Sequence, residues 1–389
     1  MTTLIQDLRQ GSLRSLAVVL QVVGMFPYTW PNTQTPSPHQ FSLVLFLWDM
    51  FIQLYINIIT PLQIVKLFLT MFRNDIGGIV LKYSVSLAFM ITSLVSALLC
   101  SKSSKLASAL TDLHARVKTN TLGNQCHMRL VYIIIVMLVE ATMVLFSVPF
   151  YINYPHLSLA EKICFFFNTL FSVPSLYMSH LFFRMTFSIL AQQLVEAVED
   201  VVSLAQHLPS HNLQPTKGQH DIATTMMDFT TTSSPLHDLE SRILQVEETR
   251  EKLTDYFFLG MTTILVTGLI LCVATIYTLS RGYFEGGFTF TLLLGATIML
   301  INMCSVGQNF INEVDKAAGM LKKFSCQSSN YFVKAQVRYL LHLLEPLQIF
   351  DFYGWYRLDY STVVGVVNLL VTYLVILVQV GDQPLNRQA

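Results

Sequence analysis

Two carboxylates stand inside apolar stretches of the sequence, where a charged group is costly. Asp49 lies in the stretch 41–65 and Glu140 in the stretch 130–152. An ionisable side chain at membrane depth usually pairs with another group or has a functional role. Glu140 could hold an amine ligand, pair with another helix or stay protonated, and we expect a structural or gating role. Asp49 is nearer the inner end of its stretch and could pair with a Lys or Arg there.

The last apolar stretch, residues 361–380, carries a helical face of mixed chemistry. Ile376, Gln379 and Val380 are three and four positions apart, so an α-helix places them on one face. Two apolar side chains and a neutral amide leave this face without charge. One role that such a face can have is helix packing, with Gln379 bridging two spans.

Residue patterns typical of enzymes and metal proteins are not found in the sequence. The six cysteines fall singly, mostly in apolar runs, and none belongs to a Cys/His cluster with metal-ligand spacing. No nucleophile–His–acid spacing and no Gly-rich phosphate loop occurs. The sequence therefore predicts neither an enzyme nor a bound cofactor or metal ion.

The composition indicates which environment must hold these residues. Charged residues make up 12% of the 389 residues and hydrophobic residues 53%, with a mean hydropathy of +0.52. A soluble domain carries about 25% charged residues, so this chain has too little charge to cover a water-exposed surface. The formal net charge of zero leaves no excess of Lys and Arg to neutralise phosphates, which excludes a basic nucleic-acid binder.

Seven stretches are apolar enough to cross a bilayer as helices of about 20 residues. They lie near 41–65, 80–100, 130–152, 163–188, 257–280, 288–309 and 361–380. With the N-terminus inside the cell, the inner segments hold 18 of the 24 Lys and Arg residues and the outer segments hold 6. Because inner loops carry the excess of positive charge, we expect a cytoplasmic N-terminus and an extracellular C-terminus.

Amphipathic segments between the spans predict a cytoplasmic anchor in this all-α membrane protein. Apolar positions recur with helical spacing in 191–207, 237–256, 311–325 and 331–345, so several spans should continue into the cytoplasm and pack there. The alternative is separate helices lying on the membrane surface. Residues 208–236 are rich in Ser, Thr and Pro and are predicted as a mobile loop.

The chain is thus expected to have six consecutive parts. They are a cytoplasmic amphipathic segment 1–40, transmembrane helices one to four in 41–190, cytoplasmic helices in 191–256, helices five and six in 257–310, anchor helices in 311–360, and helix seven with a short extracellular tail in 361–389.

Sequence elements at both ends of the chain resemble a known signature. Thr372-Tyr373, five apolar residues and Gln379 are similar to the C-terminal pattern of insect gustatory receptors. The element that precedes this pattern in the family is matched by Gly354, Tyr356, Leu358 and Asp359, and its N-terminal pattern by Leu13-Arg14, Gly24 and Pro27. The family consists of seven-span chemosensory receptor channels related to insect odorant receptors.

The resemblance implies a ligand-gated cation channel in which four subunits surround one pore and each gives its last helix to it. The assembly would be a homotetramer, or a heterotetramer with related receptors, surrounded by membrane lipid. Around a fourfold axis, Ile376 and Val380 would form apolar rings that can close a pore by dewetting. Gln379 would form a neutral ring with no charge to select one small cation sharply, so we expect a poorly selective cation pore. The family commonly has Phe where this chain has Val380, so the plug here is smaller.

A ligand pocket between the outer halves of the other spans is also implied by the resemblance. Aromatic walls with a few hydroxyls and one amide suit a small organic molecule, although aromatic residues near the outer interface also serve as bilayer anchors. The candidate ligand-binding residues are Tyr83, Phe146, Phe150, Phe167, Asn168, Phe171, Thr275 and Tyr277.

The taste quality is indicated by the residue after the Thr-Tyr pair. Leu374 stands where the main sugar-receptor branch tends to have Glu, so the chain is more similar to the bitter-compound and fructose-receptor branches. Because the bitter branch is larger, a bitter tastant is preferred, sensed at the plasma membrane of gustatory neuron dendrites. Two rival hypotheses are a G-protein-coupled receptor, which needs an extracellular N-terminus, and a transporter, whose typical internal repeats are not found.

Overall fold

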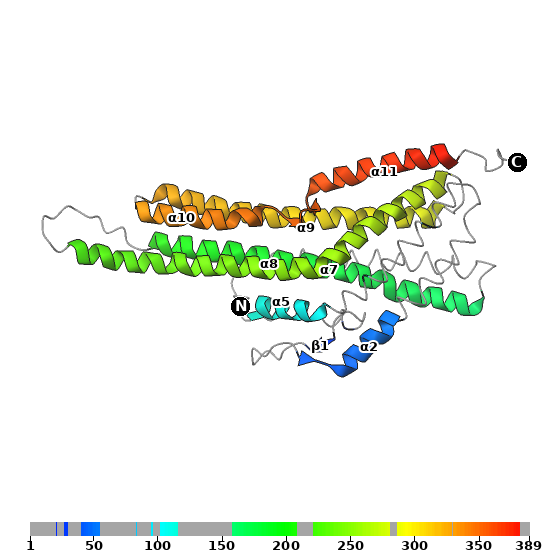
Figure 1. Cartoon of the computed structure of the whole chain (residues 1–389), viewed down its shortest axis with the longest axis horizontal. Helices are drawn as coiled ribbons and strands as arrows, with labels where there is room; N and C mark the ends of the chain where they lie inside the picture. The colour runs from blue at the N-terminus through cyan, green and yellow to red at the C-terminus, as the bar shows by residue number, and fades with distance from the viewer. Residues whose placement is uncertain are drawn as a thin grey trace. The chain divides into compact units, whose positions relative to one another are not determined.

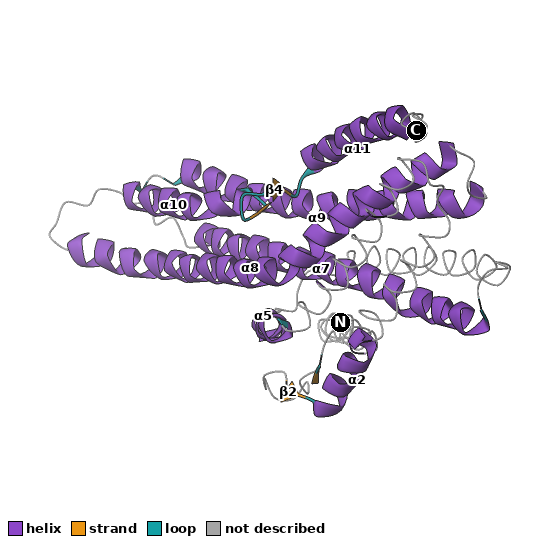
Figure 2. Cartoon of the chain, turned by 45° about the vertical axis from the view of Figure 1, so that its right-hand side comes forward, coloured by secondary structure: helices purple, strands orange, loops and turns teal. Residues whose placement is uncertain are grey.

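The computed structural model describes residues 21, 27–29, 40–54, 83, 95, 102–115, 158–207, 221–280, 286–328 and 330–381. Within these ranges the chain is mainly helical (Figures 1 and 2). The predicted span 130–152 lies outside the described residues, as does 80–100 apart from Tyr83 and Val95.

Long helices and two very short hairpins make up the described chain. The helices are α2 (Leu43–Leu54), α5 (Ser103–Ala115), α7 (Leu159–His207), α8 (Asp221–Ser280), α9 (Gly286–Gln327), α10 (Tyr331–Leu344), the 3₁₀ helix η2 (Glu345–Gln348) and α11 (Tyr360–Gly381). The antiparallel strand pairs are β1 (Tyr28–Thr29) with β2 (Gln40–Phe41), and β3 (Asp351–Phe352) with β4 (Tyr356–Arg357). The prediction of a helical protein is confirmed, whereas the hairpins were not predicted.

Three of the helices are longer than a membrane crossing requires. α7, α8 and α9 have 49, 60 and 42 residues, and a crossing takes about 20. The chain forms two compact units. The first unit comprises Met1–Arg184, Lys252–Cys304 and Tyr360–Ala389, and the second unit comprises Met185–Glu251 and Ser305–Asp359. Each of the three long helices therefore continues from one unit into the other.

The second unit is built on apolar helix faces whose spacing is visible in the sequence. On α7 and α8 the buried residues of these faces include Leu194, Val198, Val201, Leu239, Ile243 and Val246. α10 lies beside the C-terminal half of α9 in both views (Figures 1 and 2). It buries Val333, Val337, Leu340 and Leu344, a three- and four-residue recurrence that forms one apolar stripe.

Start and stop signals define α10. The Asn330 side chain accepts a hydrogen bond from the Phe332 N–H at 2.9 Å, which satisfies one of the free donors at the helix start. Pro346 has no N–H to continue the α-helical pattern, and the chain tightens into η2 there. The helix therefore ends just before the segment that leads into α11.

The predicted loop 208–236 is wrong in its second half. Residues 221–236 belong to α8, and 208–220 lie outside the described residues. Ser and Thr disfavour a helix interior by less than about 0.7 kcal/mol per residue, and extending an existing helix is far easier than starting one. A composition rich in Ser and Thr is therefore too weak a signal to stop a helix, which here runs through Pro235.

In the first unit, aromatic and polar contacts join α7 to α8 and α9. Phe183 lies edge-on to Phe257, with ring centroids 5.1 Å apart. One guanidinium nitrogen of Arg184 donates to the Asn302 side-chain oxygen at 3.4 Å.

Among the described residues, Pro235–Ala274 is the one helical segment both long and apolar enough to cross a membrane, and Leu43–Ile52 and Tyr360–Ile376 are shorter apolar helices.

Candidate functional site

The C-terminal helix α11 is apolar and largely uncovered. Its 22 residues include no charged side chain, and they rise about 33 Å, enough for the hydrocarbon core of a bilayer. Val364 is 62% exposed, whereas Val366, at 9%, is the most covered of the described apolar residues on this helix. An apolar helix left this open in a single chain needs lipid or another protein surface to cover it.

The predicted face of α11 is part of this exposed surface. Ile376 and Gln379 are both exposed, and the side chain of Val380 lies outside the description. Upstream, the Thr372 hydroxyl donates to the Asn368 carbonyl at 2.9 Å, so it is satisfied within its own helix. Tyr373 is half-exposed. The described chain therefore covers neither Gln379 nor the Thr-Tyr pair.

Gly354 forms the tip of the hairpin that precedes α11. The Trp355 N–H donates to the Phe352 carbonyl at 3.0 Å and closes a four-residue turn. Its two central residues, Tyr353 and Gly354, have φ angles of 52° and 73°, the left-handed values of a type I′ turn. No described atom lies within 4 Å of a Cβ built on Gly354. Glycine is therefore favoured there by backbone conformation rather than by lack of space.

An aromatic cluster fastens the hairpin within the second unit. The ring centroid of Phe350 lies 4.9 Å from that of Phe187 on α7 and 5.3 Å from that of Phe310 on α9. Phe352 extends the cluster, with its centroid 5.9 Å from that of Phe350. These four rings are buried and meet edge to face, a geometry that adds about 0.5–1.5 kcal/mol per pair beyond area burial.

Arg250 of α8 satisfies the end of η2. One guanidinium nitrogen donates to the carbonyls of Pro346 and Ile349, at 3.0 and 3.3 Å. Burial lowers the pKa of Arg250 while nearby acids, Glu247 first, oppose the change. An arginine stays protonated despite such a shift, so a charged donor closes the turn between α10 and the hairpin.

A glycine of α9 lets the chain before α11 approach unusually closely. A Cβ built on Gly307 would overlap the Leu358 carbonyl oxygen, and it would lie 2.7 Å from Leu358 Cβ and 2.8 Å from its carbonyl carbon. The Leu358 N–H donates to the Phe350 carbonyl at 2.8 Å. Sequence reasoning did not identify Gly307, although a lone glycine inside a helical pattern often has a packing reason.

Asp49 is buried at 1% exposure on α2. Neither of its carboxylate oxygens has a hydrogen-bond partner among the residues that the structure describes. The predicted pairing with a Lys or Arg is therefore not found within those ranges. Glu140 lies outside them.

Few of the candidate ligand-binding residues fall within the description. Tyr277 on α8 is fully buried, and Tyr83 is exposed. Phe167, Asn168 and Phe171 belong to α7 and Thr275 to α8, but their side chains lie outside the description, as Phe146 and Phe150 do entirely. The predicted pocket remains an expectation.

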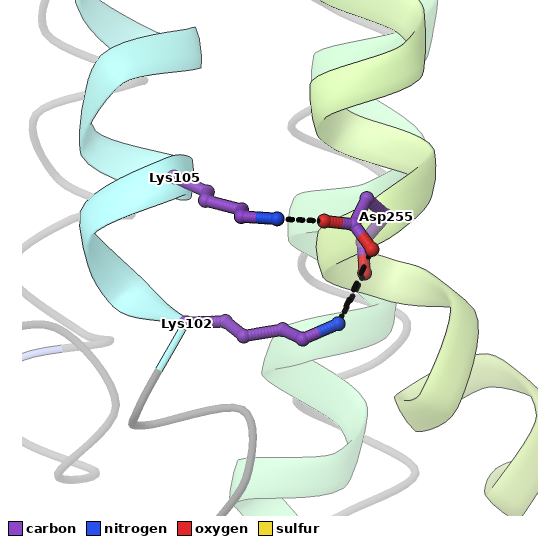
Figure 3. A network of polar contacts seen from close by, with 3 residues as sticks. All are labelled: Lys102, Lys105 and Asp255. Carbon is purple, nitrogen blue, oxygen red and sulfur yellow. Dashed lines mark hydrogen bonds and ion pairs between the residues drawn. The ribbon is translucent and has the colours of Figure 1, made fainter.

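Ion pairs between α5 and α8 are a further feature that sequence reasoning did not find. Both Lys102 and Lys105 contact the Asp255 carboxylate, with Lys102 at 3.2 Å (Figure 3). The hydrogen bond from Lys105 is the main cause that lowers the pKa of Asp255. Lys252 pairs with Asp112 at 3.0 Å. About 150 residues separate these partners along the chain, and their side chains remain partly exposed, so each pair contributes at most about 1 kcal/mol.

Helices longer than a bilayer crossing and an uncovered apolar terminal helix are typical of a helical membrane protein. The family model described as 7tm Chemosensory receptor matches residues 13–383. The chain therefore belongs to the seven-transmembrane chemosensory receptor family, which confirms the resemblance seen in the sequence. This is a family of membrane-embedded receptors and not of enzymes.

Individual relatives agree with this assignment. Gustatory and pheromone receptor 39a, isoform D, of Drosophila melanogaster is 29% identical over 133 residues, which are 31% of this chain and 35% of that receptor. The match thus spans about a third of the relative's length.

Solved structures share the fold across nearly the whole chain. The insect olfactory receptor OR5 from Machilis hrabei matches with a TM-score of 0.70 at 11% identity, covering 95% of this chain and 98% of that one. The same receptor in complex with eugenol matches with a TM-score of 0.65 at 11% identity, covering 96% and 100%. At this identity the likeness shows the fold alone.

Proposed function

We propose that this protein is a gustatory receptor that acts as a ligand-gated, poorly selective cation channel and detects small organic tastants. The observation that carries the proposal is α11, an uncharged helix exposed along most of its length. It ends in the Thr372-Tyr373 and Gln379 element in a chain of the chemosensory receptor family. A subunit that supplies one wall of a shared pore needs such a helix.

The proposed topology has seven spans, a cytoplasmic N-terminus and an extracellular C-terminus. It is supported by the inner excess of Lys and Arg, 18 against 6. In this topology the second unit is the cytoplasmic anchor, into which α7, α8 and α9 extend. A G-protein-coupled receptor would need the opposite orientation, and the likeness to an insect olfactory receptor does not favour it.

The proposed assembly is a tetramer, of this chain alone or with related receptors, in the plasma membrane of gustatory dendrites. Four copies of α11 would bring Ile376 and Val380 into apolar rings that close the pore by dewetting, with Gln379 as a neutral ring between them. The exposed state of Ile376 and Gln379 in the single chain supports this arrangement.

Small organic molecules are the proposed ligands, bitter plant compounds before fructose. The related fold of an olfactory receptor studied in complex with eugenol supports a small-molecule ligand. Leu374 after the Thr-Tyr pair supports the preference for the bitter branch.

The experiment that tests the proposal is expression of the chain alone in oocytes, with membrane current recorded during application of a panel of small organic compounds that includes fructose. We expect compound-evoked currents that Gln379→Ala and Val380→Trp alter. Val367→Trp is the matched control. Val367 is also exposed, but it lies nine residues before Ile376, about two and a half turns, and so faces the opposite side of α11.

Currents that change with both face variants and not with the control support the pore. A response that survives both face variants unchanged and requires a G protein would overturn the channel.

A further inference from the structure

We propose that Gly307 is a positioning residue for α11: its missing side chain lets the backbone at Leu358 seat against α9, and this seat lets α9 control where α11 begins. The inference rests on the proposed function, in which α11 lines and closes the pore.

The seat is a contact between two backbones. A Cβ on Gly307 would overlap the Leu358 carbonyl oxygen and lie 2.8 Å from the carbonyl carbon. Real Cβ atoms do not approach heavy atoms this closely, and a carbonyl cannot rotate away as the end of a long side chain can. A methyl group at position 307 therefore forces Leu358 off α9.

Leu358 is held in the seat from three directions. Its N–H donates to the Phe350 carbonyl at 2.8 Å, its side chain is 1% exposed, and its carbonyl lies over Gly307. Phe350 is in turn held by rings from α7 and α9. The segment before α11 is thus a fixed part of the second unit and not a flexible linker.

The connection from the seat to α11 is too short to absorb a displacement. Asp359 alone separates Leu358 from Tyr360, the first residue of α11, and consecutive Cα atoms are about 3.8 Å apart. The described chain leaves most of α11 exposed, so a displacement of Leu358 would be passed directly to the start of the helix.

α9 can carry a change in the first unit to the seat. It is one continuous helix, and Gly307 lies just after residue 304, where α9 passes from the first unit into the second. Close-packed contacts switch between discrete arrangements rather than deforming smoothly. A shift of α9 on ligand binding would therefore move the seat, and α11 with it.

The test uses Gly307→Ala in the full-length receptor, with Gly319→Ala as the matched control. Gly319 is on the same helix and in the same unit, and no described atom lies within 4 Å of a Cβ built there. A second variant, Leu358→Ala, removes the buried side chain without creating an overlap. Surface biotinylation shows which variants reach the membrane.

Two readouts separate the seat from the channel. The first is the rate at which maleimide modifies a Leu358→Cys reporter. The background for this reporter replaces by Ser the exposed Cys326 and also Cys100, Cys126 and Cys164, whose side chains lie outside the description. The second is the ligand-free membrane current. We expect Gly307→Ala to raise the modification rate at least tenfold and the ligand-free current at least threefold, Leu358→Ala to raise the current by less, and Gly319→Ala to change neither.

Each outcome decides the matter. An unchanged modification rate in Gly307→Ala overturns the seat. If Gly307→Ala speeds the modification but leaves the ligand-free current of a conducting receptor normal, the proposal that α9 controls α11 through this seat is overturned. If none of the compounds tested evokes a current from the wild-type chain, the channel proposal fails on its own. The modification rates still decide whether Gly307 seats Leu358.

Discussion

Replacing Phe350 by Ala should destabilise the second unit more than any surface change of the same kind. Phe350 is 2% exposed, and three rings lie within 4.9–5.9 Å of its centroid. Removing a buried Phe side chain costs about 3–5 kcal/mol, through lost transfer energy and the cavity left behind. Each kcal/mol corresponds to about 2–4 °C of melting temperature in domains of 150–250 residues and to about 4–8 °C in domains of 60–100 residues. The second unit lies between these sizes, so a fall of roughly 10–20 °C is expected.

The assay is thermal unfolding of the detergent-solubilised receptor, followed by the fraction that stays monodisperse after heating. Phe332→Ala is the matched control, because Phe332 is 41% exposed on α10 and its loss should lower the melting temperature by only a few degrees. Phe350→Leu should fall between the two, since it keeps most of the buried volume. Equal melting temperatures for Phe350→Ala and Phe332→Ala would refute the cluster as the fastening of the hairpin.

Three further predictions concern single contacts. Gly354→Ala should cost about 1–2 kcal/mol, because φ is +73° there, whereas Gly365→Ala on α11 should not destabilise; equal melting temperatures for the two would contradict the turn. Arg250→Gln should cost about 1–3 kcal/mol by leaving the Pro346 and Ile349 carbonyls without their charged donor. An unchanged melting temperature would argue against Arg250 as the group that stabilises the end of η2. Because the pKa of Asp255 is lowered in the folded state, its stabilisation is present above the ordinary Asp pKa and is lost as the pH falls through the lowered pKa. Asp255→Asn should therefore melt lower than the wild type at pH 7, and the difference should vanish once the pH has fallen below the lowered pKa of Asp255; a difference that persists after this carboxylate is protonated would contradict the ion pair.

Features that depend on local pattern could be predicted from the sequence. The stripe of α10 recurs at helical spacing within one segment, so its apolar face needs no knowledge of distant residues. The last apolar stretch, predicted as 361–380, is observed as α11 from Tyr360 to Gly381. Its length follows from a run of uncharged residues after Asp359.

Features that depend on contacts between distant residues could not be predicted from the sequence. Nothing near Gly307 in the sequence indicates that Leu358 lies against it, and nothing near Asp255 indicates Lys102 and Lys105. The hairpin tip is an intermediate case. A glycine is a sign of a turn, but the positive φ of Tyr353 is tolerated only because the surrounding contacts hold the hairpin in place.

The most direct measurement of the central claim is the cation selectivity of Gln379→Glu. If Gln379 lines the pore, a ring of carboxylates there attracts divalent cations, and the reversal potential of the compound-evoked current in a calcium gradient shifts toward that of calcium. Gln348→Glu makes the same chemical change outside α11 and should leave the reversal potential as in the wild type. A compound-evoked current of normal size whose reversal potential is unchanged in Gln379→Glu would contradict the assignment of α11 as the pore helix.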